Sequence, residues 1–201
     1  MRASFALLLL ALFACRKVPP PGPVHFAREE VTLDIRPGVL EVRGNYHFTC
    51  SATDRLVAVI SYPFPVDSAN LYPDSIVIAG AGHDRNPPGI SGRVPSPAYR
   101  YERSDTAVSF RMRFRPGEED SFFAYYRQPL RTNSARYIVT TTRKWQRAID
   151  LAQFRVTVPA SFHDVKLTYK PDSVVKKDST VSYYFAHRRF FPDTDIVVTW
   201  R

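Results

Sequence analysis

The sequence predicts an all-β fold in which antiparallel strands form a sandwich or a barrel. From Glu30 onward, apolar residues recur with a period of two, which is typical of strands that are buried on one face. These short runs are separated mostly by Pro, Gly, Asp and Ser, the residues that favour turns. Only one segment has helical spacing, so helices contribute little to the expected fold.

The first two strands are expected to form a hairpin. Val31, Leu33 and Ile35 alternate with polar residues, the segment 36–38 reads Arg-Pro-Gly, and the alternation resumes over 40–50. Further strands are expected at 56–62, 75–79, 99–103, 107–115, 121–127, 136–142, 154–158, 164–169, 181–187 and 195–200.

The remaining segments are one short helix and two loops. Helical spacing over 143–154 predicts one or two turns that pack Trp145 and Ile149 against an open end of the sandwich. The segments 63–74 and 80–97 are rich in proline and are expected to be loops. The second is too long for an ordinary hairpin connection, so we expect it to be either functional or poorly ordered.

The N-terminal segment is typical of a signal peptide. Arg2 precedes an apolar run over 5–14 that is too short to span a membrane, and small residues lead to Cys15. The stretch 12–15, Leu-Phe-Ala-Cys, resembles the lipobox of bacterial lipoproteins. That resemblance implies cleavage before Cys15, a diacylglyceryl thioether on its sulfur, an acylated amino group, and stable membrane anchoring by several acyl chains.

The alternative is an ordinary signal peptide in which Cys15 is incidental. Cys50 is the only other cysteine, so a disulfide between Cys15 and Cys50 would then be available in an oxidising compartment. The two readings exclude each other. If Cys15 is lipidated, we expect Cys50 to be a buried, unreactive thiol.

After Cys15 the chain is expected to be a tether. Residues 16–23 contain two basic residues and four prolines, which stiffen an extended chain. The expected organisation is a signal peptide over 1–14, a lipidated tether over 15–28, and one sandwich domain over 29–201. Within the lipoprotein resemblance, Arg16 is not the aspartate of inner-membrane sorting, which implies the outer membrane of a bacterial cell envelope.

The charge of the chain favours anionic partners. Removal of residues 1–14 takes away one arginine and leaves 27 basic against 19 acidic residues, a net charge of +8. For an exported protein this predicts contact with the membrane through the lipid anchor and with an envelope protein or an anionic glycan or lipid, and no nucleic acid.

A second resemblance lies in the stretch 136–159. A strand that ends in Tyr-x-Val-x-Thr-Thr, a turn, a Trp and a strand that ends in Val-x-Val-Pro are similar to a pattern in exported bacterial β-sandwich proteins of unknown function. The resemblance implies an immunoglobulin-like fold without a catalytic role. The expected fold is therefore an antiparallel immunoglobulin-like β-sandwich with at most one short helix.

Catalytic and metal-binding motifs are incomplete. The Ser-x-x-Lys pattern at 173–176 lacks the Lys-Thr-Gly and Ser-Asp-Asn motifs of penicillin-binding proteins. The glycines at 80–92 match neither a nucleophile elbow nor a nucleotide-binding loop. No two of the five histidines have metal-ligand spacing. We expect no catalytic residue, metal or cofactor.

The candidate binding residues are cationic and aromatic. They are Arg111, Arg113, Arg115, Tyr125, Tyr126 and Arg127. If the strands from 107 and 121 pair as a hairpin, guanidinium groups and tyrosine rings would share one patch that suits phosphate, carboxylate or sugar groups. The alternative is a solvated basic face next to tyrosines that belong to the core.

The sequence therefore favours a non-enzymatic envelope lipoprotein that binds or scaffolds a partner. The first alternative is an exported hydrolase with a site built from loop residues such as His83 and Asp84. A third reading is a subunit that pairs an exposed edge strand with another chain.

Overall fold

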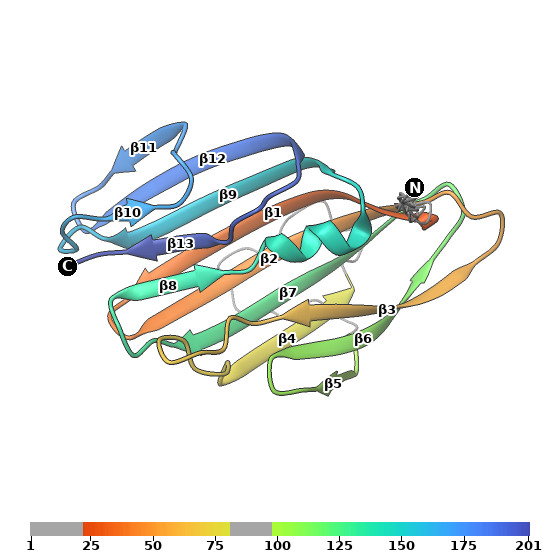
Figure 1. Cartoon of the computed structure of the whole chain (residues 1–201), viewed down its shortest axis with the longest axis horizontal. Helices are drawn as coiled ribbons and strands as arrows, with labels where there is room; N and C mark the ends of the chain where they lie inside the picture. Colours follow the sequence, from red (N-terminus) through yellow and green to blue (C-terminus); the bar gives the residue numbers. More distant parts are fainter. Residues whose placement is uncertain (1–21, 81–97) are drawn as a thin grey trace, which may run out of the picture.

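The computed structural model describes residues 22–80 and 98–201, which fold into three sheets (Figure 1). The large sheet contains β1 (Val24–Arg36), β2 (Val39–Cys50), β4 (Ser75–Gly80), β7 (Glu119–Pro129), β9 (Ile149–Pro159), β11 (Ser173–Lys176) and β12 (Thr180–Phe190). The two small sheets contain β3 (Leu56–Pro63), β5 (Tyr101–Arg103), β6 (Ala107–Phe114), β8 (Ser134–Tyr137), β10 (Lys166–Leu167) and β13 (Ile196–Thr199). A 3₁₀ helix, η1 (Thr140–Trp145), follows β8.

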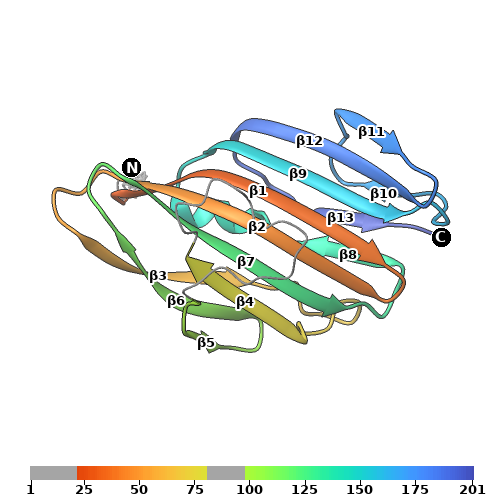
Figure 2. The ribbon, with the colours of Figure 1, turned by 180° about the vertical axis from the view of Figure 1, so that it is seen from behind.

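The strand order of the large sheet is β11-β12-β9-β1-β2-β7-β4, and the small sheets have the orders β10-β13-β8 and β3-β6-β5. Figure 2 shows the large sheet from its outer side, with the small sheets behind it. All strand pairs within the described residues are antiparallel except β1 with β9, which is parallel. The prediction of an all-β, sandwich-like fold of mainly antiparallel strands is confirmed.

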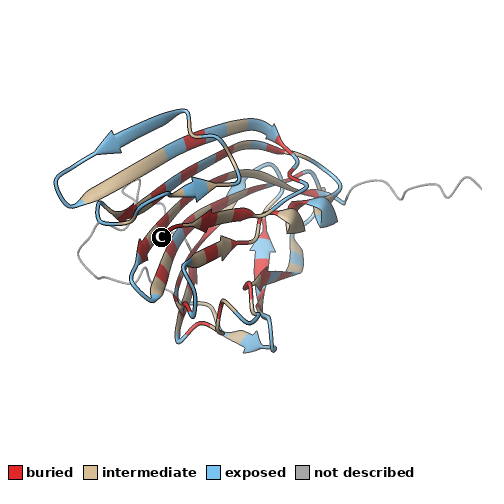
Figure 3. Cartoon of the chain, turned by 60° about the vertical axis from the view of Figure 1, so that its left-hand side comes forward, coloured by how far each residue is buried: buried red, intermediate tan, exposed pale blue. Residues whose placement is uncertain are grey.

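The core lies between the large sheet and the small sheets. Along β1 the side chains of Leu33 and Ile35 are buried while Asp34 and Arg36 lie on the outer side, because successive side chains of a strand point to opposite faces. The same alternation of buried and exposed positions continues across the strands in Figure 3. The sandwich thus buries one face of the long strands, as the period-two pattern predicts, whereas β11 is exposed at all four residues.

The predicted first hairpin is confirmed. Strands β1 and β2 pair from Val24 with Cys50 to Arg36 with Val39, and Gly38 makes the turn with a φ of 73°. That left-handed conformation favours glycine, which has no Cβ to clash with the backbone. The β1 strand begins at Val24, so residues 24–28 belong to the sandwich and not to the predicted tether.

Several predicted boundaries are wrong. The helix expected over 143–154 is a 3₁₀ helix at Thr140–Trp145, and the chain from Ile149 is strand β9. The large sheet supplies partners on both sides of that segment, so tertiary pairing overrides its weak helical spacing. The strand expected over 136–142 ends at Tyr137, and the one over 164–169 contains only Lys166–Leu167. No helix in the described part of the chain is long and apolar enough to cross a membrane.

Candidate functional site

A cavity of about 60 Å³ lies where the three sheets meet. The inward faces of β1, β2 and β7 form its floor, β3 forms one side, and the segment 137–145 forms the other. Seven of the fifteen lining residues are aromatic: Phe26, Tyr46, Phe48, Tyr62, Phe122, Tyr137 and Trp145. Glu29 also lines the cavity, and among the described residues it is the only ionisable acid or base in the lining apart from the tyrosines.

A β-bulge brings Phe26 to the cavity beside Glu29. The register of β1 against β2 shifts between Phe26 and Arg28, so one extra residue is inserted into β1. Alternation from Val31 turns Glu29 inward, and the insertion turns Phe26 to the same side. Glu29 lies opposite Tyr46 on β2 and opposite Ala152 on β9.

Glu29 is buried without compensation. Its exposed fraction is 3%, and its Oε1 atom has no hydrogen-bond partner among the described residues. Burial raises the pKa of the Glu29 carboxyl from 4.5 to about 8, because the charged form loses its hydration. At neutral pH the group is therefore mostly a protonated acid in an aromatic surrounding. A carboxyl group of this kind can exchange a proton or pair with a ligand.

Three tyrosine hydroxyls meet beside Glu29. The Tyr46 hydroxyl lies 2.7 Å from that of Tyr62 and 2.8 Å from that of Tyr137. Each tyrosine comes from a different sheet: Tyr46 from β2, Tyr62 from β3 and Tyr137 from β8. Burial raises the pKa of all three phenols, and the carboxyl of Glu29 raises it further. This tyrosine triad ties the three sheets together at the cavity.

Gly44 makes room for the central tyrosine. A Cβ atom at position 44 would lie 2.2 Å from the Tyr46 hydroxyl oxygen and 2.5 Å from Cζ, far inside contact distance. The Tyr46 ring therefore lies back over the glycine two residues earlier on β2. Its other face stacks on Phe122 at a centroid distance of 4.7 Å. These contacts hold the hydroxyl of Tyr46 between its two partners.

The wall that carries η1 is fixed by Asp195. Its Oδ1 accepts hydrogen bonds from the backbone N–H of Val139 and of Thr140, both at 3.2 Å, and from the Thr140 hydroxyl at 2.8 Å. A carboxylate that accepts bonds from the first N–H groups of a helical segment is a favourable cap. The segment with Thr141, Thr142 and Trp145 is thereby held against the cavity.

The predicted binding residues do not form one patch. Strands β6 and β7 lie in different sheets and do not pair, so the condition for a shared patch, a hairpin of the strands from 107 and 121, is not met. Arg111 and Arg113 are exposed on β6, where they lie opposite Val59 and Val57 of β3. Arg115 forms ion pairs with two carboxylates, at 2.9 Å from Glu118 and 3.5 Å from Asp120.

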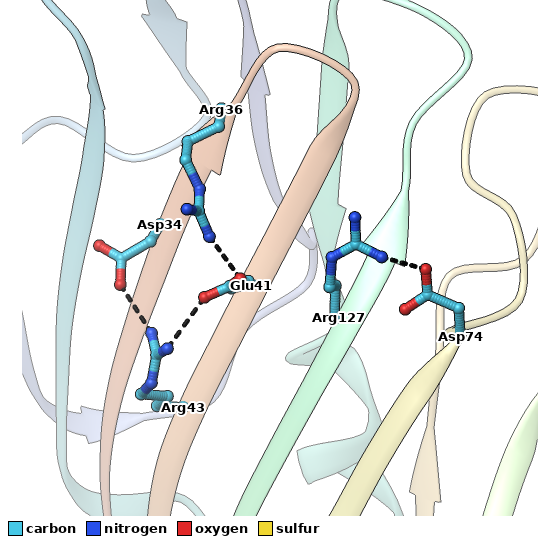
Figure 4. Close-up of polar contacts among 6 residues, drawn as sticks. All are labelled: Asp34, Arg36, Glu41, Arg43, Asp74 and Arg127. Carbon is cyan, nitrogen blue, oxygen red and sulfur yellow. Dashed lines mark hydrogen bonds and ion pairs between the residues drawn. The ribbon is translucent and has the colours of Figure 1, made fainter. Parts of the chain in front are cut away.

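The other three predicted residues are on β7. Tyr126 points into the core with an exposed fraction of 1%, so the alternative of a core tyrosine holds for it. Arg127 forms an ion pair with Asp74 on the outer face of the large sheet (Figure 4). The guanidinium of Arg43 lies 5.2 Å from the ring centre of Tyr125.

The same outer face carries a second ion-pair group. Arg43 bonds Asp34 and Glu41, both at 2.9 Å, and Arg36 also bonds Glu41 (Figure 4). The arginines here are neutralised by carboxylates of neighbouring strands. We read this face as a solvated surface of ion pairs and not as a free basic patch.

Other sequence candidates lie apart from the cavity. No group of three or more His, Cys, Asp or Glu residues in the described ranges could hold a metal ion. Cys50 is buried at the end of β2, as expected for a small apolar side chain. Cys15, His83 and Asp84 lie outside the described residues.

Comparison with known proteins identifies the fold alone. No known protein family matches the sequence, and no curated protein matches it significantly. A solved structure named a "putative nutrient binding protein" from Legionella pneumophila has a TM-score of 0.64 and 12% identity over 90% of this chain and 67% of its own. The M1 zinc metallopeptidase from Deinococcus radiodurans has a TM-score of 0.53 and 12% identity over 90% of this chain.

This chain spans only 44% of the length of the peptidase. At 12% identity both likenesses concern the arrangement of strands and transfer no activity. The all-β sandwich of this chain is thus a fold that these two proteins also contain.

Proposed function

We propose that this protein is a non-enzymatic binding module of the bacterial cell envelope, and that its binding site is the cavity around Glu29. One observation carries the proposal: Glu29 lines a cavity with an exposed fraction of only 3%, and one of its carboxyl oxygens has no hydrogen-bond partner among the described residues. A buried polar atom without a partner costs stability, roughly 1–3 kcal/mol. A ligand that bonds this oxygen would remove that cost.

The lining also fits binding better than hydrolysis. Ligand sites commonly combine apolar and aromatic walls with a few polar groups that fix orientation. The cavity has such walls, with Glu29 and the tyrosine triad as its polar groups. Hydrolysis would need a nucleophile, a base and an orienting group in contact with one another. The described lining contains no histidine or cysteine for such a set. The structurally similar protein named for nutrient binding is consistent with a binding role.

The proposed location in the cell envelope rests on the lipobox resemblance. We propose that Cys15 carries the lipid and that the chain is held at the outer membrane. The described chain starts beside the β2–β3 and β6–β7 connections (Figure 1), since Ser51 N–H bonds the carbonyl of Pro23 at 2.9 Å. Arg113 lies near this end, because the neighbouring Phe114 pairs with Leu56 at the start of β3. This end carries both charges, because Glu118, Glu119 and Asp120 at the β6–β7 connection and the start of β7 lie there too.

We further propose that Arg111 and Arg113 contact anionic head groups or glycans. They form no ion pair with any described residue, and the exposed Val57 and Val59 lie beside them. Each basic residue near an anionic surface contributes about 1 kcal/mol. We expect Arg111→Gln combined with Arg113→Gln to weaken sedimentation of the unlipidated protein with phosphatidylglycerol vesicles at least tenfold. Arg155→Gln, an exposed arginine of β9, is the control that should leave it unchanged.

We also propose that this fold is related to the immunoglobulin fold, because in both folds one core lies between two layers of sheet. The parallel β1–β9 pair is a feature that antiparallel immunoglobulin domains lack.

Thermal unfolding with a library of small molecules tests the binding role. We expect compounds that raise the melting temperature of the wild type to have no effect on Thr141→Phe, since Thr141 lines the cavity and a larger ring would fill it. Lys144→Phe is the matched control, because Lys144 lies on the same helix but outside the lining. The proposal fails if no compound stabilises the wild type, or if Thr141→Phe responds as the wild type does.

A further inference from the structure

We propose that the cavity takes the ammonium head of a small organic cation, with the Glu29 carboxylate as its counter-ion and the surrounding rings as its cage. The inference rests on the proposed binding role of the cavity and adds the chemical class of the ligand. It is carried by three properties of the lining: its charge, its rings and its size.

The charge of the lining admits a cation and opposes an anion. Within residues 22–80 and 98–201, Glu29 is the only carboxyl group of the lining, and no lysine, arginine or histidine there would pair with it or hold an anionic ligand. The remaining titratable groups that face Glu29 are the phenols of Tyr46, Tyr62 and Tyr137, which burial keeps neutral. A buried carboxylate is stabilised most by a cation at contact distance, where the surrounding dielectric is low.

The aromatic walls favour the same class of ligand. The rings of Phe26 and Phe48 stack at 4.8 Å, and Trp145 lies 5.5 Å from Phe48 and 6.4 Å from Phe26. These three rings form one wall of the cavity. Aromatic faces attract ammonium groups, most strongly in sites from which water is excluded. A carboxylate together with such a wall suits a cation better than a neutral donor.

The tyrosine triad supplies acceptors for the N–H groups of the ligand. Three hydroxyl groups share two hydrogen bonds, so the oxygens of Tyr62 and Tyr137 each retain capacity to accept a further bond. Buried donors without acceptors would be costly, and these oxygens remove that cost. A primary or secondary ammonium group therefore fits the polar side of the cavity.

The size of the cavity limits the head group. A volume of about 60 Å³ is well below the roughly 150 Å³ of an apolar protein cavity that accepts benzene. The space suits an ammonium group with one or two carbon atoms. A longer chain on the nitrogen would have to extend out of the cavity.

Binding of a cation must release a proton. The Glu29 carboxyl, with a pKa of about 8, is about 90% protonated at pH 7, and the pairing requires the carboxylate. Calorimetric titration in two buffers of different ionisation enthalpy measures this release directly. We expect about 0.9 protons released per bound cation at pH 7 and close to none at pH 10.

The experiment titrates the full mature chain with methylammonium and ethylammonium chloride, and with ethanol and acetate as neutral and anionic probes of similar size. We expect the ammonium probes to bind with proton release and the acetate not to bind. Glu29→Gln should weaken the ammonium probes at least tenfold, while Tyr126→Phe, a buried tyrosine outside the lining, should leave them unchanged.

Two outcomes overturn the inference. If ethanol binds as well as ethylammonium and Glu29→Gln does not weaken either, the cavity binds ligands but does not select cations, and the proposed binding role survives. If no ammonium probe binds up to high millimolar concentration, the cation class is refuted. The library screen with Thr141→Phe then decides separately whether the cavity binds anything.

Discussion

Replacing Glu29 by Gln should remove a pH dependence from the stability of this protein. Glutamine has nearly the shape of glutamic acid and does not ionise. In the wild type, the Glu29 carboxyl has a pKa of 4.5 when unfolded and about 8 when folded. Between these values the folded state keeps a proton that the unfolded state has lost, so the free energy of unfolding falls as the pH rises.

The size of this effect follows from the shift. Each pH unit between the two pKa values changes the free energy of unfolding by up to about 1.4 kcal/mol. Over the range from pH 5 to pH 8 the contribution of Glu29 amounts to roughly 3.5 kcal/mol. The contribution of Glu29 to the free energy of unfolding is fully present below the pKa of the unfolded state, 4.5, and is lost as the pH rises to the pKa of the folded state, about 8.

Urea unfolding of the wild type and of Glu29→Gln at pH 5, 6, 7 and 8 measures this contribution. The other titrating groups are common to both proteins and cancel in the difference. We expect the free energy of unfolding of Glu29→Gln, relative to that of the wild type, to rise by roughly 3.5 kcal/mol from pH 5 to pH 8. A difference that stays constant over this range would refute the assignment of a buried, protonated carboxyl at position 29.

Three further substitutions test the cavity and the proposed lipid anchor. Tyr46→Phe removes the centre of the tyrosine triad and should lower the free energy of unfolding in urea by about 2–4 kcal/mol. Tyr126→Phe, whose hydroxyl has no partner among the described residues, should lower it by less than about 1 kcal/mol, and equal losses would contradict the role of the triad. Gly44→Ala should lower it by about 1–3 kcal/mol and weaken ligand binding, while Gly22→Ala, with open space around its Cβ, should change neither. Cys15→Ser should abolish the mass gain of acyl chains in the envelope-expressed protein. A protein that lacks acyl chains and is two mass units lighter than its reduced form would instead have a disulfide between the two cysteines.

Much of the fold follows from the sequence because burial of one strand face is a local signal. The pattern over 31–50 predicts the first hairpin, its turn and its inward residues, and all three are present. The pairing between distant strands has no such signal. Strands β6 and β7 are neighbours in the sequence with similar alternation, and nothing in their side chains indicates that they join different sheets.

The site was harder to predict because its residues come from three sheets, and a bulge turns one of them, Phe26, inward. Counting by two from Val31 and Leu33 does place Glu29 on the inward face, and an acidic residue in that phase is the signal that could have been used. The bulge at Phe26 and the distant partners of Tyr46 are not readable from spacing. By contrast, the arginines of 111–115 were conspicuous in the sequence because exposed strand faces are often basic, whatever their role.

The energetics of Glu29 argue that the cavity is used. A position on the inner face of β1 is otherwise filled by Val31, Leu33 and Ile35, and an apolar residue would continue that pattern without any cost of desolvation. At pH 8 the carboxyl lowers stability by several kcal/mol relative to pH 5, which is a large part of the stability of a typical domain. Buried polar groups that reduce stability are common where a protein binds a ligand, since the ligand restores what folding alone leaves unpaired. The expected sign is therefore opposite for folding and for binding: Glu29→Gln should make the free protein more stable at neutral pH and the ammonium complex weaker. A purely structural role for Glu29 would make both changes unfavourable, so measuring the two together separates the roles.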